Sequence, residues 1–303
     1  MRTLSIVVLG LIFAGCAAKQ EPPYQLTKVA DGLKFPEGPA SDGKGNIFVS
    51  NCDADPGIVT KVDEKGNSSI AFTGSEKTFL KTNGMTFHQS GSLFACDFKK
   101  KAIVEIRPDG SASVYADNYQ GVAFRGPNDL AFDPNGNLYF SDPAGSGKEA
   151  PIGRVYRVDK LKKVTQVASG LAFPNGIAFS ADGKTLYVAE SQKYQVLKYP
   201  VKADGTLGEK SVFCTLPGEK DPDGMNFDSA GNLWVAQFGG GAVHEFDPSG
   251  KLIRSIELPG KNVTNVEFGG KDMKTLYITE VETGALYRIR TEVPGLKLFY
   301  GPG

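Results

Sequence analysis

Apolar and polar residues alternate in two short runs near the middle of the chain, with a turn sequence between them. Ile177 and Phe179 alternate with small residues, which predicts a strand with one apolar face. The Ala-Asp-Gly-Lys sequence that follows contains Asp and Gly, which tolerate the positive φ of a tight hairpin turn. A second apolar run then predicts the return strand. The hairpin places Asn175, just before the first strand, and Glu190, just after the second, at the same end.

This pattern occurs six times. A polar residue leads each copy, and these leading residues are Glu37, Asn83, Asn128, Asn175, Asp223 and Thr264. They are 41 to 48 residues apart, and each repeat has room for two further strands, such as residues 195–199 and 211–215. Four strands in a repeat of this length are typical of a β-propeller. The sequence therefore predicts an all-β fold, a six-bladed β-propeller with four-stranded antiparallel blades. A β-sandwich does not need this period, and the repeat of a parallel β-helix is far shorter.

The even repeat favours one domain over residues 24–303. The last repeat offers strands at residues 263–268, 275–279 and 285–289, one fewer than a blade needs. We expect residues 24–30 to supply the missing strand and close the ring, which removes the exposed sheet edge. Residues 296–300 are an alternative for that role.

The chain carries 34 basic and 34 acidic residues, with no long run of either sign. This balance does not suggest a nucleic-acid surface. We expect a monomer that acts on a small molecule.

The first residues have the composition of a targeting segment. Arg2 precedes an apolar run at residues 4–13, which is too short to span a bilayer comfortably. Ala14 and Gly15 then precede Cys16, a junction that resembles the bacterial lipobox. We therefore predict a lipoprotein signal peptide at residues 1–15, lipidation of Cys16 and a tether at residues 16–23. The protein would then be exported and held at the cell envelope by its lipid alone. The alternative is an ordinary signal peptide that is cut nearby, with Cys16 incidental.

Three further cysteines, Cys52, Cys96 and Cys214, form no CxxC pair, so a zinc or redox motif is not indicated. Export would permit a disulfide, and Cys52 and Cys96 both lie near the ends of second strands in neighbouring blades. Buried free thiols are the favoured interpretation.

In a propeller the first strand of each blade lines the central channel, so the six leading residues would surround one mouth of it. They comprise two carboxylates, three amides and a threonine, and all of them offer oxygen. Hard oxygen ligands with two negative charges suit Ca²⁺, which accepts six to eight oxygens in flexible geometry, whereas Mg²⁺ requires a tighter octahedron.

The second strands end at the same mouth. Their terminal residues are also polar: Asn51, Asp97, Asp142, Glu190, Gln237 and Glu280. We expect some of them to orient ligands or to line the pocket, and we predict Asn83, Asp142 and Glu190 as substrate contacts. The long loop at residues 143–153 is a candidate lid, with a plain surface loop as the alternative.

Several short motifs together resemble the SMP-30/gluconolactonase/luciferin-regenerating-enzyme family. They occur in order at residues 35–39 (FPEGP), 126–130 (GPNDL), 173–176 (FPNG), 221–224 (DPDG) and 268–270 (FGG), the last followed by residues 275–279 (TLYIT). The resemblance implies a six-bladed propeller with a divalent cation in its channel, usually Ca²⁺, with Zn²⁺, Mn²⁺ or Mg²⁺ as alternatives. Many members of the family hydrolyse lactones.

The resemblance also assigns roles to residues. It places metal ligands at Glu37, Asn175 and Asp223, with Asn128 as a ligand or a substrate contact. The gluconolactonase branch has an Arg two residues before that Asn, whereas here Arg125 stands three residues before Asn128. We retain Arg125 as a predicted substrate contact.

The predicted chemistry is metal-assisted hydrolysis of a lactone, with Asp223 as the general base. The chain has only two histidines, His88 and His244, and the pattern places neither at the mouth. This excludes a Ser-His-Asp triad and the histidine-assisted mechanism proposed for paraoxonase-type propellers. Two alternatives stay open: a non-catalytic binding or scaffold propeller, and a phosphotriesterase or strictosidine-synthase-like enzyme on the same fold.

The export prediction is tested at Cys16. Mass spectrometry of protein extracted from membranes should find a lipid-modified N-terminus at Cys16. An unmodified N-terminus at any other residue would rule out the anchor.

Overall fold

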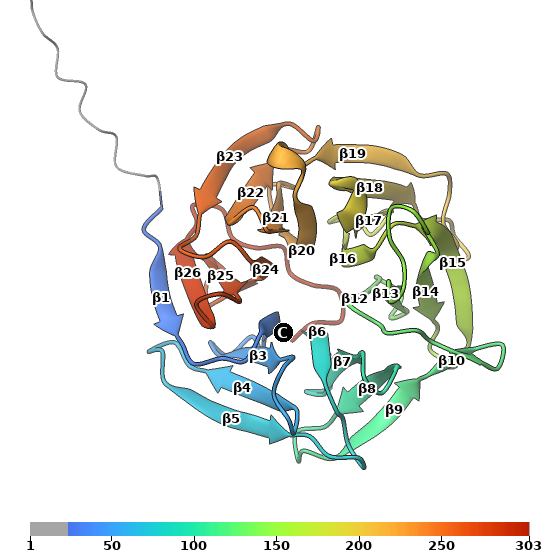
Figure 1. Ribbon diagram of the computed structural model, residues 1–303, viewed down its shortest axis with the longest axis horizontal. Coiled ribbons are helices and arrows are strands. Elements are labelled where there is room, and N and C mark those ends of the chain that lie inside the picture. Colours follow the sequence, from blue (N-terminus) through green and yellow to red (C-terminus); the bar gives the residue numbers. More distant parts are fainter. Residues whose placement is uncertain (1–23, 303) are drawn as a thin grey trace, which may run out of the picture.

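The computed structural model describes residues 24–302 as a ring of six four-stranded antiparallel sheets (Figure 1). In blades 1 to 3 the strands are β2 (Pro36–Ser41), β3 (Ile47–Asn51), β4 (Ile58–Val62), β5 (Ser68–Thr73), β6 (Thr82–Phe87), β7 (Leu93–Asp97), β8 (Ala102–Ile106), β9 (Ala112–Ala116), β12 (Leu130–Phe132), β13 (Leu138–Asp142), β14 (Gly153–Val158) and β15 (Val164–Leu171). In blades 4 to 6 they are β16 (Pro174–Phe179), β17 (Thr185–Glu190), β18 (Gln195–Pro200), β19 (Ser211–Thr215), β20 (Asp221–Phe227), β21 (Leu233–Phe238), β22 (Ala242–Phe246), β23 (Leu252–Glu257), β24 (Val263–Gly269), β25 (Thr275–Glu280), β26 (Ala285–Arg290) and β1 (Thr27–Ala30). The predicted six-bladed propeller is confirmed.

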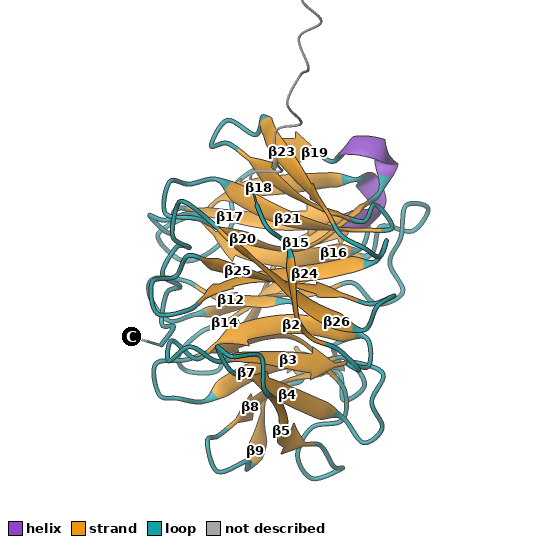
Figure 2. Ribbon diagram, turned by 90° about the vertical axis from the view of Figure 1, so that its left-hand side faces the viewer, coloured by secondary structure: helices purple, strands orange, loops and turns teal. Residues whose placement is uncertain are grey.

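Little else interrupts the blades. A small hairpin, β10 (Asn118–Tyr119) and β11 (Val122–Ala123), follows blade 2, and two short 3₁₀ turns are η1 (Ser191–Lys193) and η2 (Pro217–Glu219). Loops gather on the two faces of the ring (Figure 2). No helix within residues 24–302 is long and apolar enough to cross a membrane.

The hairpin on which the repeat was recognised forms as expected. Pro174 pairs with Glu190 and Phe179 with Leu186, so Asn175 and Glu190 do lie at the same end. The N–H of Gly183 donates to the carbonyl oxygen of Ser180 at 2.8 Å and closes the turn, with Gly183 at a φ of 65°. Here glycine supplies the positive φ that the turn requires.

The hydrophobic core lies between neighbouring blades. Six buried clusters occupy the six interfaces, and in one of them Phe94 and Ile103 of blade 2 meet Phe132 and Tyr156 of blade 3. Each blade therefore buries both faces, which accounts for the apolar runs in the second and third strands.

The inner strands approach one another so closely around the axis that some positions exclude any side chain. A Cβ at Gly176 would overlap the backbone carbonyl of Asp223, and one at Gly224 would overlap the amide of Asn265. Gly38 and Gly84 occupy the same repeat position under the same constraint. The glycine that follows four of the leading residues is thus required by packing, and only Gly38 has a positive φ.

Both ends of the described chain meet the ring. The segment β1 pairs with β26, so the N-terminal strand completes blade 6 as expected. The C-terminal tail, residues 294–300, instead crosses the far end of the channel (Figure 1). The N–H of Leu296 donates to the carbonyl oxygen of Phe227 at 2.8 Å, and the carbonyl oxygen of Tyr300 accepts from the N–H of Gln89 at 2.7 Å. The tail therefore ties blade 5 to blade 2.

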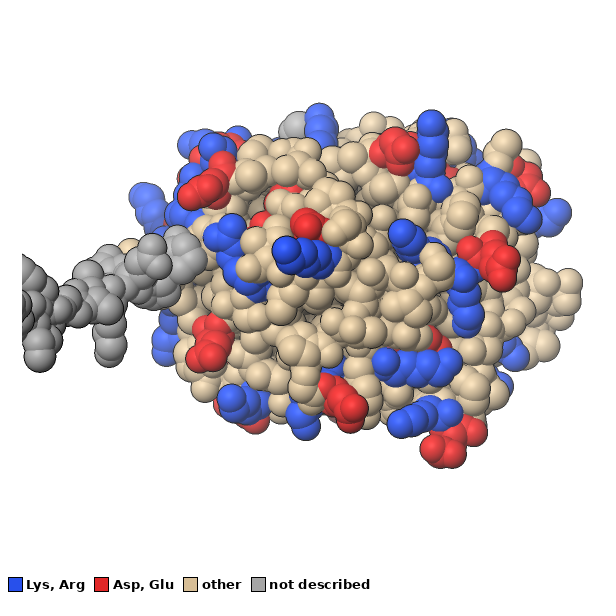
Figure 3. All heavy atoms as spheres, turned by 90° about the horizontal axis from the view of Figure 1, so that it is seen from above, with Lys and Arg blue, Asp and Glu red and all other residues tan. Residues whose placement is uncertain are grey.

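The three cysteines of the described region are buried free thiols, as favoured above, and Cys52 and Cys96 form no disulfide. The predicted signal peptide, Cys16 and the tether lie outside residues 24–302, so export and lipidation stay predictions. Over the side of the ring drawn in Figure 3, basic and acidic side chains are interspersed. This pattern agrees with the balanced composition.

The tail offers a test of how the ring is held. Truncation after Gly295 removes the contact of Phe299 with Phe179 and the stacking of Tyr300 on His88. We expect the free energy of unfolding to fall by about 2 kcal/mol, because several half-buried apolar side chains are lost. Thermal unfolding should show this as a lower Tm, whereas the exposed substitution Lys297→Ala should leave Tm unchanged. An unaltered Tm in the truncated protein would show that the tail is not structural.

Candidate active site

Five of the six leading residues line one cavity of about 260 Å³ at the predicted mouth. These are Glu37, Asn83, Asn128, Asn175 and Asp223. Thr264 is the exception and corrects the expectation of a complete ring of six. Its hydroxyl donates to the carbonyl oxygen of Pro36 at 2.8 Å and lies 2.8 Å from the hydroxyl of Thr279, so it joins blade 6 to blade 1.

Local strand geometry explains why the leading residues face the channel. The pairing of β16 with β17 shifts between Pro174 and Ile177, and that of β20 with β21 shifts between Pro222 and Met225. Such a bulge adds a residue to one strand and re-aims the side chains beside it. The leading residue lies within the shifted segment in each case, and blades 1 and 2 have the same irregularity.

The two carboxylates of this ring are buried. The Oε2 atom of Glu37 accepts from the N–H of Gly38 at 2.8 Å and from the amide of Asn265 at 3.3 Å. Burial raises the pKa of Glu37 to about 7, and the charge of Asp129 also raises it. Burial raises the pKa of Asp223 well above its ordinary value, and the charges of Glu37 and Asp129 add to the effect. Each carboxylate therefore disfavours ionisation of the other.

The carboxylates of this cavity have no basic side chain beside them in the part of the chain that the structure describes. The cavity lining, taken over residues 24–302, contains the carboxylates Glu37, Asp221 and Asp223 but no Lys, Arg or His. Two oxygens of the ring, Oδ1 of Asp223 and Oδ1 of Asn83, are buried without a hydrogen-bond partner. Such atoms cost free energy unless something binds them.

The donor set fits a hard divalent cation. It consists of carboxylate and amide oxygens, which Ca²⁺ prefers, and it includes the two unpartnered oxygens. No group of three His, Cys, Asp or Glu side chains able to hold a metal occurs in the described part of the chain. A cation here would thus depend on amides as much as on carboxylates.

Two predicted substrate contacts, Asp142 and Glu190, lie behind the mouth and not in the cavity lining. Asp142 accepts from the backbone N–H groups of Arg125 and Gly126, the shorter bond being 2.7 Å. Glu190 accepts from the N–H of Ala172 at 2.9 Å and from the amide of Gln195 at 2.7 Å. Both side chains are fully buried and fix the segments that enter the inner strands. This is a positioning role.

A second cavity of about 320 Å³ adjoins the first and shares Phe35, Asn83, Asn128 and Phe173 with it. Arg125 belongs to this second lining, together with Asn128. Among the described residues its guanidinium has no ion pair or hydrogen bond, which leaves it available to an oxygen of a ligand.

The candidate lid, the loop at residues 143–153, lies at the mouth. Pro143 and Ala144 line the second cavity. The hydroxyl of Ser146 donates to the carbonyl oxygen of Leu171 at 2.6 Å and accepts from the N–H of Phe173 at 3.1 Å. The base of the loop is thus fastened to the segment that leads into blade 4.

Sequence analysis missed several lining residues. Phe35, Phe173 and Asp221 stand two positions before a leading residue and share its cavity. This shared offset is a sequence signal that could have identified them. Phe238 ends β21 and Gln192 follows β17, and neither gave a comparable signal.

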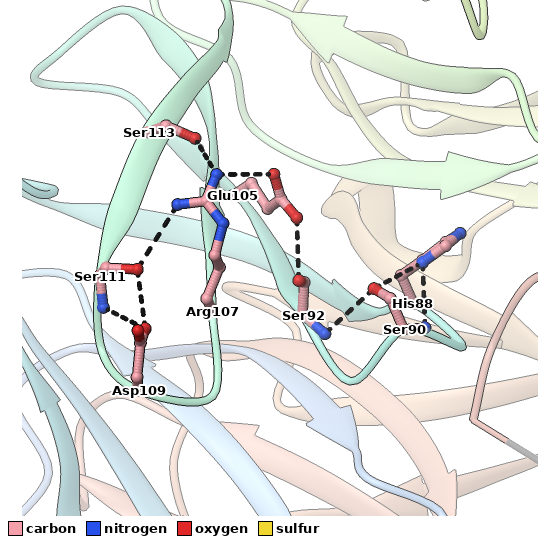
Figure 4. A network of polar contacts seen from close by, with 8 residues as sticks. All are labelled: His88, Ser90, Ser92, Glu105, Arg107, Asp109, Ser111 and Ser113. Atoms are coloured by element: carbon pink, nitrogen blue, oxygen red, sulfur yellow. Dashed lines mark hydrogen bonds and ion pairs between the residues drawn. The ribbon is translucent and has the colours of Figure 1, made fainter.

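Neither histidine reaches the mouth, as expected. His88 lies in the β6–β7 turn at the far face, with Nδ1 2.8 Å from the hydroxyl of Ser90 (Figure 4). His244 is buried between Gln237 and Ser255, each 2.8 Å from one ring nitrogen. Burial lowers the pKa of His244 to about 4, so it is neutral near pH 7.

Comparisons with known proteins agree with this geometry. The profile of the family described as "SMP-30/Gluconolactonase/LRE-like region" matches residues 35–282. A diisopropyl-fluorophosphatase of Loligo vulgaris is 28% identical over 90% of this chain and 94% of its own length. A gluconolactonase of Zymomonas mobilis subsp. mobilis is 29% identical over 88% of this chain and 81% of its own length. The solved structure of a gluconolactonase from Xanthomonas campestris superposes with a TM-score of 0.77 at 26% identity, over 89% of this chain and 90% of that one.

Proposed function

The chain belongs to the SMP-30/gluconolactonase/LRE-like family, and from that membership we propose that it is a hydrolase of lactones that depends on a divalent cation. Relatives named gluconolactonase and lactonase confirm the expectation of a lactone-hydrolysing enzyme. The observation that carries the finer proposal is the cavity with three carboxylates, two unpartnered oxygens and no basic side chain.

Glu37, Asn128, Asn175 and Asp223 would hold the cation, and Ca²⁺ suits their oxygens best. A cation bound there would supply Lewis acidity that polarises the lactone carbonyl. Asn83 lines the same cavity with a free Oδ1, and Arg125 lines the second cavity, which Asn83 also lines. These two side chains would orient the oxygens of the substrate.

Asp223 is the group proposed to move the proton. Its Oδ1 has no partner in the protein, so it can accept a proton from the water that attacks the carbonyl carbon. As the bond between that carbon and the ring oxygen breaks, the ring oxygen takes the proton back from Asp223. The product is a hydroxy acid, and Asp223 returns to its ionised form.

A second candidate activity comes from the similarity to the diisopropyl-fluorophosphatase, which covers 90% of this chain. A phosphorus ester would use the same cavity, and release of fluoride from a phosphofluoridate would detect that activity. A scaffold role, the other alternative, predicts that cation binding occurs without hydrolysis of either substrate class.

Export as a lipid-anchored protein is a further proposal, carried by residues 13–16 of the sequence.

Two substitutions separate the proton acceptor from the cation ligands. Asp223→Asn keeps the shape and one oxygen but loses the proton acceptor, so lactone hydrolysis should fall by about 10²–10⁴-fold. Glu37→Gln should act mainly through affinity for the cation, so excess Ca²⁺ should restore part of its activity but little for Asp223→Asn. Initial rates at increasing Ca²⁺ measure both effects.

Asp182→Asn makes the same chemical change in an exposed turn carboxylate and should behave like the unaltered protein. Equal rescue of both site variants by saturating cation would mean that Asp223 is only a ligand. A protein that binds the cation but hydrolyses no lactone would support the scaffold alternative.

A further inference from the structure

We propose that this enzyme selects lactones that carry an apolar substituent over the polyhydroxylated sugar lactones. The inference rests on the proposed lactone hydrolysis and adds the substrate class. It comes from the two-lobed shape of the mouth and from the chemistry of the lobe that does not hold the carboxylates.

The two lobes share lining residues but differ in chemistry. All three carboxylates line the first lobe, of about 260 Å³, while the second, of about 320 Å³, has none of them. Asn83 and Asn128 belong to both linings and lie where the lobes meet. A lactone whose carbonyl faces the carboxylates would therefore extend its ring substituent past these two amides into the second lobe.

Apolar atoms make up most of the wall of the second lobe, and its polar side chains are few. Phe98, Pro127, Pro143 and Ala144 supply apolar atoms, and the two prolines have no N–H to donate. The thiol of Cys52 is already committed, because it donates to the carbonyl oxygen of Thr82 at 3.0 Å.

Two backbone N–H groups of this wall are committed as well. The N–H groups of Arg125 and Gly126 both donate to Asp142, behind the wall. The remaining polar side chains are Arg125, the exposed Asp53 and the two amides where the lobes meet, and the rest of the lobe is apolar. A sugar hydroxyl placed there would lose its hydrogen bonds to water without replacing them, which costs free energy.

Aromatic rings line both lobes. Phe35 and Phe173 lie between them, Phe98 in the second and Phe238 in the first, and all four side chains are half-buried. Phe35 and Phe173 also have a positive φ, of 52° and 57°. This conformation is unfavourable for a bulky residue and tends to persist where function needs it.

The test compares two lactones that share a five-membered ring, together with a six-membered sugar lactone. γ-Nonalactone differs from γ-butyrolactone by a pentyl chain, and glucono-1,5-lactone represents the hydroxylated class. With Ca²⁺ present, we expect kcat/KM for γ-nonalactone to exceed that for each of the other two by about tenfold or more. A kcat/KM for glucono-1,5-lactone equal to or above that for γ-nonalactone would overturn the inference and leave lactone hydrolysis intact.

Substitutions in the second lobe should change the preference itself. Phe98→Ala should lower the ratio of kcat/KM for γ-nonalactone over γ-butyrolactone by about tenfold, and Phe98→Leu should restore most of it. Val212→Ala, on the exposed outer strand β19, is the matched control and should keep the ratio. If Phe98→Ala does not fold, Ala144→Asp, which puts a charge in the same lobe, should lower the ratio as well. A ratio that none of these variants changes would contradict the assignment of the lobe.

If the protein hydrolyses no lactone, the proposed function is refuted. The affinities of the two γ-lactones can then still be compared by measuring their binding. Calorimetric titration of Asp223→Asn with γ-nonalactone and γ-butyrolactone should then show about tenfold tighter binding of the former. Equal affinity for both would refute the apolar lobe as well.

Discussion

Six inner strands meet around one axis, and their close approach is the constraint on which the rest of the structure depends. At four blades it excludes any side chain after the leading residue, which explains the recurrent glycine at Gly38, Gly84, Gly176 and Gly224. Five of the leading side chains line the mouth, and their oxygens come together there. The site is therefore a consequence of how the blades pack.

As a result, several carboxylates lie close together along the channel. Glu37 and Asp223 lie at the mouth, while Asp129 and Glu267 lie deeper, near the tail that crosses the far end. Burial raises the pKa of Asp129 to about 7 and that of Glu267 above its ordinary value. A folded protein can tolerate this cluster only if protons or a cation compensate it. Bound cation, in this account, both stabilises the ring and prepares the site for hydrolysis.

Much of the fold and of the candidate site could be predicted from the sequence, because both depend on the regular spacing of the repeat. The hairpin of residues 174–190, the six blades and five of the six leading residues all follow from the repeat. Thr264 was misplaced because its short hydroxyl is satisfied by the carbonyl of Pro36, a contact that joins the first and last blades. Asp142 and Glu190 end strands at the mouth but turn inward to backbone N–H groups, which depends on loop conformation. The course of the tail and the aromatic lining are likewise tertiary features.

The central claim is that a cation replaces protons on the buried carboxylates. Without a cation, Glu37 has a folded pKa of about 7 against an ordinary value of 4.5, so the folded state holds a proton that the unfolded chain has released. Stability without the cation should therefore fall as the pH rises from about 4.5 to 7. The most direct measurement is thermal unfolding with Ca²⁺ or with a chelator at pH 5 and pH 8, together with elemental analysis. Our account predicts one equivalent of divalent metal and a stabilisation of about 2.7 kcal/mol at a hundredfold excess over Kd, larger at pH 8 than at pH 5. No bound metal and an identical Tm with and without chelator at pH 8 would contradict it.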